Sequence, residues 1–96
     1  MPELLNPNEI ASQLKSLPGW TGDDRQIEKT FQLKDFKGAL DLLNQVGEIA
    51  EEMDHHPDLF LHSWNKLKIV IATHSAGGVT TNDVSLAQKI EEIAGK

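Results

Sequence analysis

Residues 59–74, LFLHSWNKLKIVIATH, decide the fold class that the sequence predicts. In the second half of this stretch, residues 67–74, one strand face is apolar and is formed by Leu67, Ile69 and Ile71. Residues 59–64 are a second strand candidate, and Asn65-Lys66 is expected to make a tight connection. Because strands joined by a short turn pair antiparallel, the stretch predicts an antiparallel hairpin.

The rest of the chain supplies two more strands and three helices. Residues 26–33 alternate with a period of two, and Trp20 begins a short extended segment before an expected turn at 21–24. The helices are expected from a cap at Asn8 to Pro18-Gly19, from a cap at Asp35 along Phe36, Leu40, Leu43, Val46, Ala50 and Met53, and after a capping box at residues 80–83 along Val84, Ala87, Ile90 and Ile93. This order predicts an α+β fold, an antiparallel four-stranded sheet with three helices packed on one face.

Size and charge restrict the classes of function. A chain of 96 residues is too short for two cores, so residues 1–96 are expected to form a single domain. The net charge of -6 and the lack of a basic stripe argue against direct nucleic-acid binding, which requires phosphate neutralisation. No apolar run reaches membrane-span length and residues 1–10 do not resemble a signal peptide, so a cytoplasmic protein without membrane contact is expected. The uncovered face and edges of the sheet favour a homodimer or homotetramer.

Three histidines, His55, His56 and His74, are the candidates for chemistry. Histidine titrates near neutral pH, so a cluster can donate and accept protons under the same conditions. Pro57 disfavours helical geometry at His56, which places the first two at a helix-to-strand corner, whereas His74 ends a predicted strand. A site requires that strand end to lie near the helix end. The alternative is scattered histidines in an ordinary small domain, because composition alone names no reaction.

Neighbouring carboxylates suggest support for the histidines, and other chemistries lack a pattern. Glu51 lies one helical turn before His55, a spacing at which a carboxylate can fix the tautomer of an imidazole. The alternative is a solvated helix face, since Glu52 and Asp54 adjoin it. Cysteine, HExxH and His-x-His are all absent, which disfavours a metal site, and the serines near the histidines lack a nucleophile-elbow pattern.

A longer pattern joins these residues. Residues 51–58, EEMDHHPD, are followed by Trp64-Asn65, Thr73-His74, Gly77-Gly78 and Thr80-x-x-Asp83. This pattern resembles the signature of the pterin-4a-carbinolamine dehydratases. The early Gly19-Trp20 and the order of predicted elements also fit, so the resemblance extends over nearly the whole chain.

The resemblance implies a lyase that dehydrates 4a-hydroxytetrahydropterin to quinonoid dihydropterin in tetrahydropterin recycling, without a metal or an organic cofactor. It places His55, His56 and His74 in the catalytic site, with His55 and His74 as the acid–base residues and His56 binding and orienting the pterin. The positions that it implies for support or substrate binding are Glu51, Asp54, Pro57, Trp64, Thr73 and Asp83.

One segment departs from the family pattern. Residues 58–63 are one residue longer than the form seen in animal members, and Leu59 stands where a tryptophan often follows the proline. The longer form occurs in photosynthetic organisms, so the departure bears on pocket shape and pterin preference. His62 matches no catalytic position and is expected to be a strand side chain. Because some relatives are protein partners, in transcription-factor dimerisation or Rubisco assembly, a non-catalytic protein-binding module is the alternative function.

Overall fold

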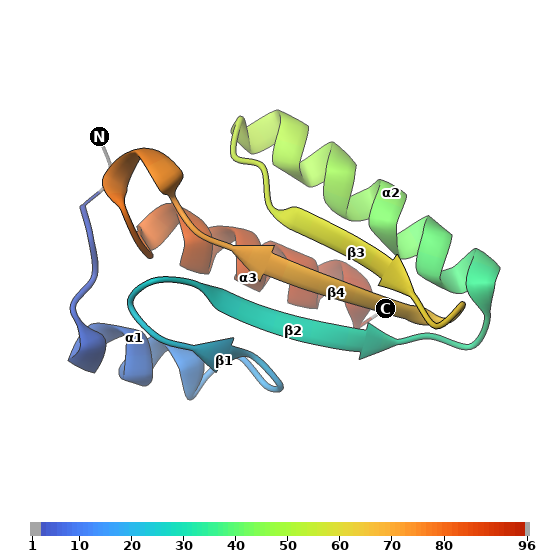
Figure 1. The fold of residues 1–96 in the computed structure, drawn as a ribbon, viewed down its shortest axis with the longest axis horizontal. Helices are drawn as coiled ribbons and strands as arrows, with labels where there is room; N and C mark the ends of the chain where they lie inside the picture. Colours follow the sequence, from blue (N-terminus) through green and yellow to red (C-terminus); the bar gives the residue numbers. More distant parts are fainter. Residues whose placement is uncertain (1–2, 96) are drawn as a thin grey trace.

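The computed structural model describes residues 3–95, whose strands form one antiparallel sheet covered by helices (Figure 1). The elements follow in the order α1 (Pro7–Leu14), β1 (Thr21–Gly22), β2 (Ile27–Gln32), α2 (Phe36–Met53), β3 (Asp58–His62), β4 (Lys66–Ile71), the 3-10 helix η1 (His74–Ala76) and α3 (Thr81–Ala94). Across the sheet the strand order is β1-β2-β4-β3, and every neighbouring pair is antiparallel. The predicted α+β class, with a four-stranded antiparallel sheet and three helices, is confirmed.

The predicted hairpin is formed by β3 and β4, but its turn differs from the prediction. His62 pairs with Lys66, so the connection is residues 63–65 and not Asn65-Lys66. Asn65 is instead buried and bonds to the end of β2: its carbonyl accepts from the Leu33 N–H at 2.8 Å, and its side-chain Nδ2 donates to the Leu33 carbonyl at 3.1 Å. The turn residue therefore holds the hairpin against β2.

The N-terminal helix begins earlier than predicted. The cap is Asn6 and not Asn8, because Pro7 suits the first helical position and Glu9 completes a capping box. The Asn6 side chain accepts from the Glu9 N–H at 2.9 Å, and the Glu9 carboxylate accepts from the Asn6 N–H at 2.9 Å. Thr21–Gly22, expected to be part of a turn, pairs with β2 as the short strand β1.

Helix α2 confirms its predicted cap and only part of its predicted apolar stripe. The Asp35 carboxylate accepts from the Gly38 N–H at 2.7 Å. The buried face consists of Ala39, Leu42, Val46 and Ala50, whereas Phe36 and Leu40 are 50% and 40% exposed. Both sets step by three or four residues, so periodicity alone cannot choose between them. No helix within residues 3–95 is long and apolar enough to cross a bilayer.

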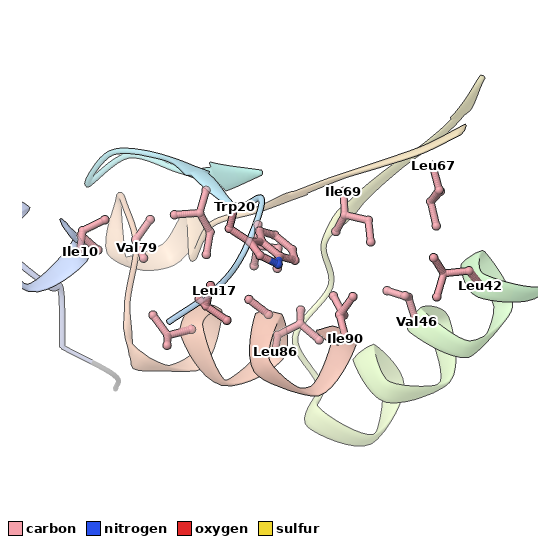
Figure 2. Packing of buried hydrophobic residues seen from close by; sticks show 14 residues of the cluster. Ile10, Leu17, Trp20, Leu42, Val46, Leu67, Ile69, Val79, Leu86 and Ile90 are labelled. Carbon is pink, nitrogen blue, oxygen red and sulfur yellow. The ribbon is translucent and has the colours of Figure 1, made fainter. Parts of the chain in front are cut away.

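The core lies between the sheet and the helices, where side chains from both layers meet (Figure 2). Its central members are Leu67 and Ile69 from β4, Leu42 and Val46 from α2, and Leu86 and Ile90 from α3. Full burial of one such side chain contributes roughly 1.5–3 kcal/mol relative to exposure. This apolar layer fixes the helices on the sheet and leaves the strand ends free to carry a site.

A charged residue on the inner face of β2 is accommodated by specific partners. Lys29 Nζ donates to Glu91 at 2.8 Å and to the Pro18 carbonyl at 2.7 Å, and Trp20 Nε1 donates to the same Glu91 oxygen at 3.0 Å. These contacts tie β2 to α3 and to the segment before β1. Lys29 therefore shares the inner face with apolar side chains without leaving its charge unpaired.

The β1–β2 turn rests directly on the loop that follows β4. The Val79 N–H donates to the Asp24 carbonyl at 2.9 Å. A Cβ added at Gly78 would lie 2.4 Å from the same Asp24 oxygen, which is far inside contact distance. Glycine at position 78 thus allows the two backbones to approach.

We expect Gly78→Ala to lower the free energy of unfolding by about 1–3 kcal/mol, because the methyl group forces the two backbones apart. Gly47→Ala is the matched control: it lies within α2, and an added Cβ meets nothing within 4 Å. The control should raise stability by about 0.4–1 kcal/mol. Urea unfolding monitored by circular dichroism measures both. A Gly78→Ala protein as stable as the wild type would contradict the close approach.

Candidate active site

Three connections meet at one end of the sheet: the α2–β3 corner, the β4–α3 loop and the β1–β2 turn (Figure 1). The corner forms because Asp54 takes left-handed angles, φ 51° and ψ 44°, and ends α2. The His55 N–H still bonds to the Ala50 carbonyl at 3.0 Å, and Pro57 then leads into β3. His55 and His56 therefore lie at the helix-to-strand corner that the sequence predicts.

Asp83 links this corner to the β4–α3 loop. It is fully buried at the third position of α3, where it forms the predicted capping box with Thr80. Its Oδ2 accepts from the Thr80 N–H at 2.7 Å and from Thr73 Oγ1 at 2.8 Å, while Oδ1 lies 2.5 Å from His55 Nε2. An ionised carboxylate only accepts, so the hydrogen of this contact is on Nε2. That arrangement leaves His55 Nδ1 for proton transfer.

His56 and Glu51 form the second pair at the corner. The expected Glu51–His55 pair is not formed: His56 Nε2 contacts Glu51, and His55 contacts Asp83. The left-handed Asp54 breaks the helical spacing, so the residue five positions on reaches Glu51 instead of the one four positions on. Both members of the pair are exposed, so it stabilises the fold by at most about 1 kcal/mol.

His74 is next in sequence to Thr73, a member of the Asp83 network. It begins η1 directly after Thr73, whose hydroxyl bonds to Asp83. Its side chain is exposed and lines a shallow cavity of about 250 Å³. The other lining residues are Arg25, Gln26, Ala72, Thr73, Gly77 and Gly78. Thr73 therefore joins the buried carboxylate to the open cavity.

The structure brings most of the predicted site residues to this end of the sheet. They are Glu51, Asp54, His55, His56, Pro57, Thr73, His74 and Asp83. Trp64 is not among them, because it lies in the turn at the far end of β3 and is 61% exposed (Figure 1). His62 is an exposed residue of β3, as expected. Within residues 3–95, no three His, Asp or Glu side chains are grouped as a metal site would require.

Two residues of this region are not among the predicted site residues. Thr80 is predicted as a helix cap and as part of the family pattern, and its hydroxyl also lies 2.8 Å from Thr73 Oγ1. Arg25 reaches the cavity only because the β1–β2 turn rests on Gly78 and Val79. No pattern in the sequence predicts that contact, because it depends on the docking of segments more than fifty residues apart.

Comparison with known proteins identifies the family. The family model described as pterin 4 alpha carbinolamine dehydratase matches residues 3–93. The chain belongs to this family. A relative from Thermosynechococcus vestitus that bears the family name is 42% identical and aligns over 98% of both chains. A second, from Sulfurisphaera tokodaii, is 45% identical over 93% of this chain and 95% of its own length.

Two solved structures resemble this dehydratase-family fold. A Brucella melitensis protein described as a transcriptional coactivator/pterin dehydratase is 36% identical, with a TM-score of 0.88 over 95% of this chain and 98% of that chain. A pterin dehydratase-like protein described as a RuBisCO assembly factor in the alpha-carboxysome is 17% identical. Its TM-score is 0.64 over 80% of this chain and 88% of that chain, which shows a shared fold alone.

Replacement of Asp83 should destabilise the protein. Asp83→Ala leaves the Thr80 N–H without its buried acceptor, at about 1–3 kcal/mol, and removes one of the two partners of the Thr73 hydroxyl. Asp83→Asn keeps the shape and one carbonyl acceptor, so its loss should be smaller. Asp41→Asn, at an exposed position of α2, should change stability by less than about 0.5 kcal/mol. Urea unfolding measures the stability of each variant. Equal stability of Asp83→Ala and Asp41→Asn would contradict the stabilising role of the Asp83 network.

Proposed function

We propose that this protein dehydrates 4a-hydroxytetrahydropterins to quinonoid dihydropterins. Family membership supports the reaction class. The observation that carries the proposal is the arrangement of His55 on the buried Asp83, with Thr73 joining that carboxylate to His74. One imidazole held by a buried acceptor and a second one exposed beside a cavity suit a reaction that needs a proton donor and a proton acceptor at the same pH.

The elimination balances with two proton transfers and no redox change. One histidine protonates the 4a-hydroxyl as its bond to the ring carbon breaks, and water leaves. The other takes a proton from the ring nitrogen, so that a carbon–nitrogen double bond forms. His55 and His74 fill these two roles, and the reaction needs no cofactor. His56, with Glu51 against its ring, binds and orients the pterin.

The remaining corner residues shape the site. Asp54 ends α2 with left-handed geometry, and Pro57 keeps the backbone at His56 extended, so together they direct the two histidines. Thr73 holds the start of the His74 segment against Asp83. The whole chain, residues 1–96, acts as one domain in this proposal.

Loss of either acid–base histidine should slow dehydration about a hundredfold or more, the usual range for a general acid or base. The variants are His55→Ala and His74→Ala. His62→Ala is the control, since His62 is exposed on β3 and its side chain hydrogen-bonds, among residues 3–95, to the neighbouring Ser63 alone. An absorbance assay with freshly generated 4a-carbinolamine measures the rates. Wild-type protein that does not exceed the buffer rate would refute the enzyme proposal.

We also propose that the chain self-associates through the edge strand β3. β3 has a partner on one side only, and Phe60 on its outer face is 52% exposed. Antiparallel pairing of two β3 edges would bring the Trp64 end of one copy to the histidine end of the other. The Trp64 role expected from the family resemblance would then come from a second copy.

Phe60→Glu should shift the protein toward monomer, because it introduces a charge in place of an exposed apolar side chain on the unpaired edge strand. Gln32→Glu is the control, since it adds a charge to the outer face of β2, away from that edge. Light scattering after size-exclusion chromatography gives the mass of each protein. Equal masses for Phe60→Glu and wild type would exclude this interface.

A protein-binding role is the second candidate function. It is favoured by the Brucella melitensis relative, which is described as both a coactivator and a dehydratase. Two exposed apolar side chains are available for such a role, Phe60 in the middle of β3 and Trp64 in the turn that follows it. A partner complex that survives His74→Ala but not Phe60→Glu would support it.

A further inference from the structure

Arg25 is the only arginine in the chain, and it lines the same cavity as His74. It lies in the β1–β2 turn, and its guanidinium forms no ion pair and no hydrogen bond with any residue from 3 to 95. Five donors in a fixed planar fork are thus available at the rim of the cavity. Nothing in the fold uses them.

The turn that carries Arg25 is held in place from within and from outside. Inside the turn, the Asp23 carboxylate accepts from the Arg25 N–H at 2.8 Å, and the Asp23 N–H donates to the Gln26 carbonyl at 3.1 Å. From outside, the Val79 N–H donates to the Asp24 carbonyl at 2.9 Å. The Arg25 backbone is therefore positioned beside the histidine loop before any ligand binds.

Strand order fixes where Arg25 lies relative to the histidines. Arg25 precedes β2, His74 follows β4, and His55 precedes β3, and the sheet places these strands in the order β2-β4-β3. Since neighbouring strands are about 4.8 Å apart, two strand spacings separate the Arg25 end from the His55 end, and His74 is central. A pterin ring that reacts between His55 and His74 would therefore have Arg25 on the side away from His55.

The exposure of the two side chains also places Arg25 on the side of the ring away from His55. The His55 side chain is 12% exposed, whereas Arg25 is in an exposed turn. The reacting ring atoms must reach the partly buried histidine, so a substituent that extends away from it meets the open rim. A guanidinium only donates hydrogen bonds, so it selects an oxygen-bearing substituent over a hydrocarbon one.

We infer that Arg25 binds the hydroxylated side chain of the pterin substrate and makes the enzyme prefer such pterins to those with an apolar substituent. The inference rests on the proposed dehydratase function. Its physical content is a charge-assisted hydrogen bond from the guanidinium to a side-chain oxygen, made alike in the ground and transition states. Such a contact acts on KM and leaves kcat unchanged.

The test compares two substrates, the 4a-carbinolamine of tetrahydrobiopterin, which has a dihydroxypropyl side chain, and that of 6-methyltetrahydropterin. Arg25→Gln should raise KM for the first about tenfold or more, the range for a hydrogen bond to a charged group. For the 6-methyl substrate it should change kcat/KM by less than about twofold. Arg25→Lys keeps the charge but not the planar fork of donors. Its KM for the tetrahydrobiopterin substrate should therefore lie between those of wild type and Arg25→Gln.

Lys34→Gln is the matched control, because it removes one exposed positive charge outside the cavity and should leave both substrates unaffected. Equal losses for both substrates in Arg25→Gln, or no loss, would overturn the inference. Equilibrium binding of 7,8-dihydrobiopterin and 6-methyl-7,8-dihydropterin separates it from the proposed reaction. If wild type catalyses nothing but Arg25→Gln weakens only dihydrobiopterin binding, Arg25 keeps its role and the dehydratase proposal fails. If neither pterin binds to wild type, both fail.

Discussion

Asp83 has a fully buried carboxylate whose oxygens reach the α2–β3 corner, the β4–α3 loop and the first turn of α3. A buried carboxylate without partners would be strongly unfavourable, and here the Thr80 N–H, the Thr73 hydroxyl and the His55 ring satisfy it. The requirement acts in both directions. The three segments must converge for Asp83 to be tolerated, and Asp83 keeps them together once they converge.

This shared group couples folding to the proposed chemistry. The same carboxylate completes the capping box of α3 through one oxygen and contacts the His55 ring through the other, so one buried group belongs to both the helix start and the site. His56 and Glu51, by contrast, form an exposed pair that can move without disturbing the core. The site therefore has one histidine held by buried structure and others free to adjust to a ligand. This combination suits a reaction that needs one catalytic group in a fixed orientation and open access for the substrate beside the others.

Local patterns in the sequence predicted most of the fold. The alternation in β4, the Asp35 cap and the Thr80–Asp83 capping box are short-range signals whose physics is complete within a few residues. The apolar stripe of α2 was predicted correctly at Val46 and Ala50 but not at Phe36 and Leu40, because two overlapping stripes satisfy the same periodicity. Only packing on the sheet selects Ala39 and Leu42. The Asn8 cap was wrong for a different reason: Asn6 offers an equally good acceptor, and Pro7 decides between them.

The site shows the same division between local and long-range information. Residue types and the family pattern predicted the histidines, but spacing paired Glu51 with the wrong ring, because one left-handed residue redirects the chain. Arg25 could not be found at all. Its place depends on β1, two exposed residues that would hardly persist alone, and on the backbone contact that Gly78 allows. The absence of a side chain at Gly78 allows the backbone contact that places Arg25 beside the cavity. No pattern within either segment predicts that contact.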